Sequence, residues 1–194
     1  MTNFIEPYNP NWKSEFEKIK QVIESELKEL YPLTDIQHVG STAIPGLFAK
    51  PILDIDIIID HKDLLLPISL NLEKLGYKNK GEQGIEGRFA FRQTSNFVPL
   101  SAMENKWQQH HLYVCYKDSL ALKNHLLFRD ILRNNKAVME QYAALKQYLV
   151  NGLKLSGEEY NIRKTDFIIS VLATTGLDET ALRDITNANS RPLI

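Results

Sequence analysis

The first half of the chain alternates between helical and strand-like spacing of its hydrophobic residues. Ahead of Pro32, large apolar side chains recur every three or four positions, which predicts an amphipathic helix; they are Trp12, Phe16, Ile19, Ile23, Leu27 and Leu30. A short strand is expected over residues 35–39 and a second over 52–59, where β-branched residues dominate. A helix is expected from residue 64 to residue 75.

The second half of the chain becomes predominantly helical. Glycine and proline break residues 77–100 into short strands, most simply a hairpin or meander, and residues 110–116 predict a further strand. Helical spacing follows over residues 119–133, 137–149 and 158–173, with a short helix expected over 178–185. The pattern predicts an α+β fold in which a mixed β-sheet has flanking helices and a C-terminal helical layer.

Composition places the chain among ordinary globular proteins. It has 194 residues, enough for one domain, and 43% hydrophobic with 24% charged residues excludes a disordered or fibrous class. The net charge of −1 indicates no general affinity for nucleic acid or anionic membranes. The N-terminus lacks the pattern of a secretory signal, and no apolar run approaches the roughly 20 residues that span a bilayer. We therefore expect a cytoplasmic protein with no membrane partner.

The chain has a single cysteine, Cys115. This excludes an intrachain disulfide and a thiolate zinc cluster. Because Cys115 lies in an apolar strand-like run, we expect it to be a small core residue rather than a nucleophile.

Two acids interrupt the most hydrophobic predicted strand. Asp54 and Asp56 occupy alternate positions, so their carboxylates lie on the same face of that strand. Two desolvated carboxylates repel each other unless a cation lies between them, and Mg²⁺ (or Mn²⁺) suits this role. The alternative is that both acids lie at an exposed strand end and serve as caps or ion-pair partners.

The segment Gly40-Ser41-Thr42 follows the preceding strand and adds a candidate phosphate site. Glycine lets the backbone approach a ligand closely, and the hydroxyls and free amides can bind phosphate oxygens. Such a loop, followed by two acids on one strand, supplies phosphate contacts and metal ligands together. Phosphoryl and nucleotidyl transfer need both.

The central motif resembles that of the GrpB family, a bacterial family in the polymerase-β-like nucleotidyltransferase superfamily. The resemblance spans roughly residues 5–170, and it rests on the run from His38 to Leu47 (HVGSTAIPGL), then Ala49-Lys50-Pro51-Ile52 with Asp54, His111-Leu112, His125-Leu126, Phe128-Arg129-Asp130, Tyr142, Lys146, Tyr160 and Lys164. It implies a family domain over residues 1–174 and leaves 175–194 as a C-terminal extension.

The resemblance also implies roles for individual residues. Gly40 and Ser41 match the Gly-Ser loop of the superfamily, and Asp54 and Asp56 match its two metal-binding acids. A third carboxylate is usual on a neighbouring strand. This sequence has His111 and Tyr113 there, where family members tend to have two histidines, so His111 is a candidate auxiliary ligand or base. A substitute third acid would be Glu86.

Several basic residues are further candidates for phosphate binding. Lys50 precedes the acidic strand, Arg88 and Arg92 share one face of a predicted strand, and Arg129 belongs to a polar helical stripe with His125 and Arg133. Each could instead be a solvated surface residue. The motif context favours a functional role for Lys50, and the match to family positions favours a substrate-facing or core-bridging role for the helical stripe. His38 could orient a phosphate or serve only as a hydrogen-bonded structural residue. The pairs Tyr142/Lys146 and Tyr160/Lys164 could support a nucleotide base and phosphate, but we expect them to pack over the core.

The leading hypothesis is a Mg²⁺-dependent transferase that moves a nucleotidyl group from a nucleoside triphosphate, or acts on another phosphorylated small molecule, with an unknown acceptor. The alternative is a catalytically inactive module that binds a nucleotide or a CoA-type ligand. A transferase that modifies RNA or protein is a third reading, but no basic tract supports nucleic-acid binding.

Overall fold

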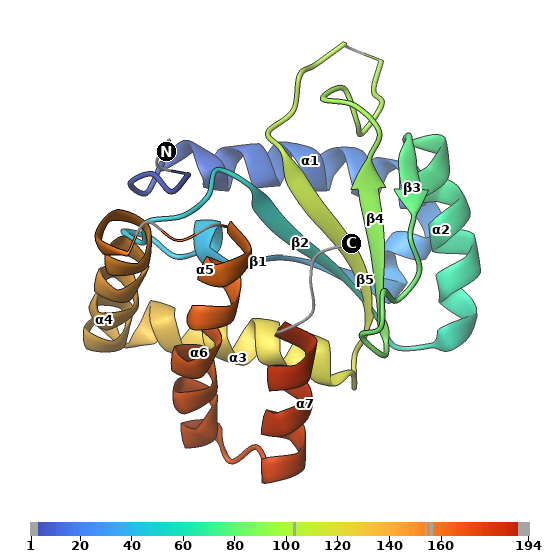
Figure 1. The fold of residues 1–194 in the computed structure, drawn as a ribbon. Coiled ribbons are helices and arrows are strands. Elements are labelled where there is room, and N and C mark those ends of the chain that lie inside the picture. Colours follow the sequence, from blue (N-terminus) through green and yellow to red (C-terminus); the bar gives the residue numbers. More distant parts are fainter. Residues whose placement is uncertain (1–3, 103, 154, 156, 190–194) are drawn as a thin grey trace.

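The computed structural model describes residues 4–102, 104–153, 155 and 157–189. The first half of the chain forms two helices and two strands joined by short 3₁₀ turns (Figure 1): α1 (Asn11–Leu27), β1 (Thr34–Val39), β2 (Leu53–Ile59) and α2 (Leu65–Lys74). The two strands and α2 lie within two residues of the ranges expected from the hydrophobic pattern. Helix α1 ends at Leu27, before the stop expected at Pro32, and residues 28–33 form a 3₁₀ helix instead.

Three strands and five helices complete the described part: β3 (Tyr77–Asn79), β4 (Arg88–Gln93), β5 (His110–Tyr116), α3 (Leu120–Asn134), α4 (Lys136–Gln147), α5 (Gly157–Arg163), α6 (Thr165–Leu172) and α7 (Glu179–Asn189). The expected hairpin is β3 with β4, which pair antiparallel. The described residues between β4 and β5 form no strand.

The five strands form one mixed sheet in the order β1-β2-β5-β4-β3. Only β2 and β5 run parallel, and the other neighbouring pairs are antiparallel. The α+β fold with a mixed sheet is therefore confirmed. The two central strands, β2 and β5, place Asp54 directly beside His111 and Asp56 directly beside Tyr113.

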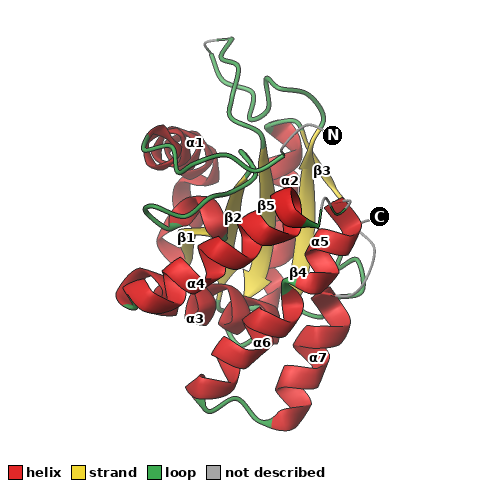
Figure 2. Ribbon diagram, turned by 60° about the vertical axis from the view of Figure 1, so that its left-hand side comes forward, coloured by secondary structure: helices red, strands yellow, loops and turns green. Residues whose placement is uncertain are grey.

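The two faces of β2 have opposite character. Leu53, Ile55 and Ile57 are buried in one hydrophobic core with α1 and α2. Asp54 and Asp56 point to the other face, because side chains alternate along a strand. Figure 2 shows α3 to α6 gathered in front of the sheet on that second side, with α2 behind it. The acids therefore lie between the sheet and the C-terminal helical layer.

Residues 158–173 do not form the single helix that their spacing predicts. The helix breaks at Lys164, between α5 and α6. The Thr165 hydroxyl donates a hydrogen bond to the Asn161 carbonyl at 3.1 Å, and bonding of this kind to the preceding turn bends helices. The last helix, by contrast, is longer than expected and begins where the Asp178 side chain accepts a hydrogen bond from the Ala181 amide at 2.8 Å.

One further expectation concerns the burial of Cys115. Cys115 is fully buried, as expected for a core residue, and burial together with the charge of Asp56 raises the pKa of its thiol. Within the described residues, no helix combines the length and the apolar character needed to cross a bilayer.

Candidate active site

The Gly40 loop lies against the carboxylate of Asp54. Val39, the last residue of β1, pairs with Asp54, so the chain turns into the loop beside the acid. Gly40 has φ +68°, and a Cβ built there would lie 2.2 Å from Asp54 Oδ2. Glycine is therefore needed at this position both for its backbone conformation and for the close approach of Asp54.

Asp54 forms a pair with His111 of β5. The Asp54 Oδ1 to His111 Nδ1 distance is 3.0 Å, and the Asp54 side chain retains 32% of its exposure. Burial acts to raise the pKa of this carboxyl, but the hydrogen bond and charge of His111, with the charges of His125 and Lys164, hold the pKa below its usual value. Asp54 is therefore a carboxylate at neutral pH.

Asp56 forms a second, deeper pair with His125 of α3. Its Oδ2 lies 2.8 Å from His125 Nδ1, and the Asp56 side chain is fully buried. Burial acts to lower the pKa of His125, but the charge and hydrogen bond of Asp56 raise it above its usual value. Asp56 Oδ1 is buried without a hydrogen-bond partner among the described residues. Such an atom is costly to leave unpaired and is available to a cation.

Ser41 contacts a buried lysine from the helical layer. The Lys146 ammonium donates to Ser41 Oγ at 2.9 Å and to the Phe48 carbonyl oxygen, and only 2% of Lys146 is exposed. Ser41 is thereby tied to α4. Ser41 and Lys146 are 105 positions apart in the sequence, and the packing of the helices onto the sheet brings their side chains together.

Two more lysines lie beside Lys146. Lys50 and Lys164 lie over the ring of Tyr160, with Nζ 5.4 Å and 5.3 Å from its centroid. Burial, with repulsion from Lys164, lowers the pKa of Lys146 well below its usual value, and burial with repulsion from Lys50 lowers that of Lys164 to about 8. The repulsion indicates that an anion bound here would relieve strain among the ammonium groups.

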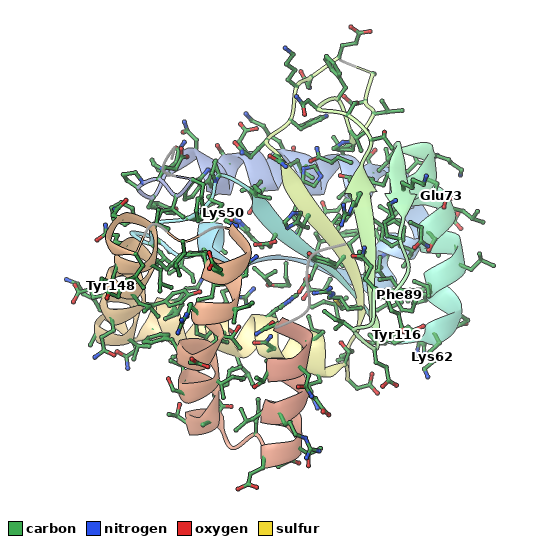
Figure 3. All side chains as sticks on the ribbon, in the orientation of Figure 1. Lys50, Lys62, Glu73, Phe89, Tyr116 and Tyr148 are labelled. Carbon is green, nitrogen blue, oxygen red and sulfur yellow. The ribbon has the colours of Figure 1, made fainter. Side chains whose placement is uncertain are left out.

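The cavity between the sheet and the helices has a volume of about 310 Å³. Its walls include two histidines that are paired with carboxylates, the three lysines and two arginines. The lining residues include Gly40, Ser41, Lys50, Asp54, Arg88, His111, Tyr113, His125, Arg129, Lys146, Tyr160 and Lys164. Figure 3 shows Lys50 close to α5, at one end of this region. Asp56 lies beneath His125 and is not in the cavity wall.

Thr42 and His38 lie outside that cavity wall and bond to each other. Thr42 Oγ1 is 3.0 Å from His38 Nε2, and both residues are buried. Burial lowers the pKa of His38 to about 4, with Asp54 opposing and Arg133 and Arg129 assisting. His38 is therefore neutral at physiological pH and contributes to the packing beneath the Gly-Ser loop.

The arginines considered in the sequence, Arg88, Arg92, Arg129 and Arg133, differ in their positions and hydrogen bonds. Arg88 lines the cavity, 4.5 Å from the centroid of the Tyr113 ring, and its Nε is buried without a hydrogen-bond partner among the described residues. Arg92 is exposed and lies outside the cavity wall. Arg129 lines the cavity but donates to Gln37 Oε1 at 2.8 Å and to the His38 carbonyl at 3.2 Å. Arg133 donates to the Ala43 carbonyl.

The expected position of a third carboxylate holds Tyr113. This side chain faces the site next to His111 and His125, with ring centroids 6.3 Å and 6.1 Å away. Glu86 is exposed in the turn before β4 and lines a neighbouring cavity instead. No group of three or more His, Cys, Asp or Glu within the described ranges is arranged to hold a metal ion.

Two residues in the site were not predicted to act there. Lys146 and Lys164 were expected to pack over the core, because an aromatic residue and a lysine at helical spacing usually pack. The stripe of His125, Arg129 and Arg133, by contrast, was interpreted as facing a substrate or bridging the core. The repetition of that pair on successive helices, Tyr142/Lys146 and Tyr160/Lys164, was the available signal. Sequence spacing alone does not tell which face of a helix meets a sheet.

Comparison with known proteins places this chain in a family. The model of the family described as "GrpB protein" matches residues 3–174. The Alkalihalophilus pseudofirmus glutamate-rich protein GrpB is 31% identical over 85% of this chain and 91% of its own length. The Bacillus subtilis protein YqkA is 33% identical over 73% of this chain, but the match spans only 38% of YqkA.

Solved structures agree with this placement. The crystal structure of GrpB from Enterococcus faecalis has a TM-score of 0.70 and 29% identity, covering 92% of this chain and 97% of that one. A structure of Cid1 in complex with its short product ApU has a TM-score of 0.51 at 14% identity, covering 74% of this chain and 42% of that one. The second likeness shows a shared nucleotidyltransferase-like fold alone.

Proposed function

The chain belongs to the GrpB family, and we propose that it is a metal-dependent nucleotidyltransferase that moves a nucleotidyl group from a nucleoside triphosphate to an acceptor. One observation carries the proposal. Lys50, Lys146 and Lys164, called the lysine wall, line the same cavity as Ser41 and Asp54, and Asp56 lies buried beside it. A polyphosphate needs the lysines and its metal ion needs the acids.

Two carboxylates of the chain are the candidate ligands of a divalent cation. Asp54 and Asp56 would hold Mg²⁺ or Mn²⁺, since both project from the same face of β2 and Asp56 Oδ1 is buried without a partner among the described residues. A bound cation would neutralise charge on the phosphate oxygens. His111 and His125 keep the two carboxylates oriented through their Nδ1 atoms.

The rest of the reaction is assigned to groups of the chain. Ser41, Lys146 and Lys164 bind the β- and γ-phosphates, while Lys50 and Arg88 extend the positive wall. The acceptor oxygen bonds to the α-phosphorus as the bond from that phosphorus to the bridging oxygen breaks, and pyrophosphate leaves against the lysines. His111, held by Asp54, is the candidate acceptor for the proton that the attacking hydroxyl releases.

Nucleotide binding is tested by the change in melting temperature. We expect ATP with MnCl₂ to raise the melting temperature of the wild-type protein, and Lys146→Met to remove that shift, because the substitution deletes the ammonium beside Ser41. Absence of any shift in the wild type, with no nucleotide density after a crystal soak, would refute the proposal.

A catalytically inactive ligand-binding module is the second candidate function. Two observations favour it: both acids are already paired with histidines, and Tyr113 occupies the place of a third carboxylate. Such a module would bind a nucleotide or a CoA-type ligand through the same lysine wall. Calorimetric binding of ATP or CoA without release of pyrophosphate from any nucleoside triphosphate would support it, and detection of a nucleotidylated product would exclude it.

A further inference from the structure

A second cavity, of about 710 Å³, adjoins the candidate active site. The two share Arg88, Asn124 and His125 in their walls, as well as Ala188 and Asn189 of α7. The second cavity thus opens from the His125 side of the site. Its remaining walls come from the turn before β4, from the first turn of α3 and from the end of α7.

The charge of the second cavity is opposite to that of the lysine wall. Four acids line it, Glu82, Glu86, Asp118 and Asp184, and the last three are exposed. Besides His125, which is paired with Asp56, two cations line the wall, and both lie over aromatic rings: Lys62 is 5.6 Å from the centroid of Tyr116, and Arg88 is 4.5 Å from that of Tyr113. The acids therefore dominate the charge that a ligand meets at its mouth.

An aromatic edge completes the cavity. Phe89 and Tyr116 meet edge to face, with centroids 5.5 Å apart, and both line it. Figure 3 shows Lys62, Phe89 and Tyr116 together, well away from Lys50. A ligand here would meet both aromatic carbon and carboxylates, a combination that suits an organic cation.

We propose that this second cavity binds the acceptor, and that the acceptor is a small cationic molecule carrying both an amine and a hydroxyl group. This rests on the proposed function, since the acceptor hydroxyl must reach the α-phosphorus from the side opposite the departing pyrophosphate. That hydroxyl forms the new oxygen–phosphorus bond and gives up its proton. The acidic lining repels a phosphodiester chain, which favours a cationic acceptor over RNA.

Helix α7 provides one side of this cavity, through Asp184, Ile185, Asn187, Ala188 and Asn189. The family model matches residues 3–174 and so stops before this helix. The choice of acceptor is therefore determined in part by a segment outside the matched family domain.

The charge of the cavity is tested with spermidine as a cationic probe, by calorimetry at low ionic strength without nucleotide or metal. The wild type is compared with the full-length triple variant Glu86→Gln/Asp118→Asn/Asp184→Asn and with Glu73→Gln, an exposed acid on α2 (Figure 3). We expect the triple variant to bind spermidine about tenfold more weakly, because three carboxylates are neutralised, and Glu73→Gln to bind as the wild type does.

Failure of the wild type to bind spermidine, equal affinities in the wild type and the triple variant, or tighter binding of decauridylate than of spermidine would overturn the proposal. ATP binding with MnCl₂ is measured in the same variants, and we expect it to be unchanged in the triple variant. If none of the three proteins bound ATP, but the wild type still bound spermidine more tightly than the triple variant did, the proposed transferase function would be refuted and the cation site would stand.

Discussion

At the residue scale, Gly40 sets the position of the Asp54 carboxylate. The glycine combines φ +68° with a backbone that Asp54 Oδ2 approaches closely. Gly81 has nearly the same φ, +66°, yet a Cβ there would have no neighbour within 4 Å. Substitutions at these two glycines therefore distinguish the strain of a left-handed backbone from the clash with Asp54.

We expect Gly40→Ala to lower the free energy of unfolding by about 2–4 kcal/mol, since it adds a steric clash to the strain of positive φ. Gly81→Ala should lower it by only about 1 kcal/mol, from strain alone. Urea unfolding of both variants measures the difference. Equal losses in the two variants would show that Asp54 is not held against Gly40.

The double variant Gly40→Ala/Asp54→Ala refines the comparison. Removing the carboxylate deletes Oδ2, the atom 2.2 Å from the added Cβ. The double variant should therefore be more stable than the sum of the single effects predicts, by about 1 kcal/mol or more.

The lysine wall predicts a pH dependence. Burial and repulsion from Lys50 lower the pKa of Lys164 to about 8, so its ammonium loses its proton as pH rises through that value. We expect ATP affinity, measured by calorimetry in EDTA, to fall between pH 7 and pH 9, while the phosphates of ATP remain ionised. Lys164→Arg should flatten this profile because arginine stays charged. An unchanged slope in that variant would argue against a role of Lys164 in binding.

The same pKa acts in the opposite direction on stability. Between pH 8 and the usual lysine pKa of 10.5, the unfolded chain binds more protons at this position than the folded chain does. The penalty for a buried ammonium is present in full below pH 8 and is relieved above it. Lys164 should therefore make the ligand-free protein more stable with rising pH over that window, while ATP binding weakens.

The sequence predicted the acids and the Gly-Ser loop because they lie close together in one segment. Asp54 and Asp56 needed only the alternation of a strand to be placed on one face. Lys146 and Lys164 were not predicted to act there, since their contacts with the loop depend on how distant helices pack. The approach of Arg88 to Tyr113 likewise depends on the pairing of β4 with β5.

At the element scale, Arg129 ties α3 to β1. Its guanidinium donates to the Gln37 side chain and to the His38 carbonyl, and only 8% of the residue is exposed. We expect Arg129→Met to lower the free energy of unfolding by about 2–3 kcal/mol, because charged hydrogen bonds are lost and a buried carbonyl is left unpaired. Thermal or urea unfolding measures this.

Arg183, exposed on α7, is the control for the loss of a guanidinium. Arg183→Met should change stability by no more than about 0.5 kcal/mol. If Arg129→Met were equally mild but weakened ATP binding, Arg129 would instead be a ligand-binding residue.

The central strands were predictable because each is a short apolar run of β-branched or aromatic residues. The run from His110 to Tyr116 gave β5 its observed bounds. The bend at Lys164 was not predictable, since residues 158–173 keep a helical pattern of apolar residues through it. A threonine hydroxyl that bonds to the preceding turn leaves no trace in that pattern.

At the scale of the whole molecule, the C-terminal helix shares the core of the helical layer. Ile185 is 3% exposed and packs in one hydrophobic cluster with Ile168 and Leu172 of α6 and with Ile44 and Leu47 from the loop after β1. Segments far apart in the sequence therefore meet beside the candidate site. Figure 1 shows α7 beside α6, below the sheet.

This packing predicts that α7 unfolds together with the domain. Ile185→Ala should lower the free energy of unfolding by about 2–4 kcal/mol, because it leaves a cavity in the shared cluster. Ile162→Ala, at a residue 45% exposed, should cost under about 1 kcal/mol. The measurement follows tryptophan fluorescence, which reports on Trp12 and Trp107 in the opposite core, alongside far-UV circular dichroism. If α7 melted separately, Ile185→Ala would leave the fluorescence midpoint unchanged; a shift of both signals together would make α7 part of one cooperative unit with the sheet.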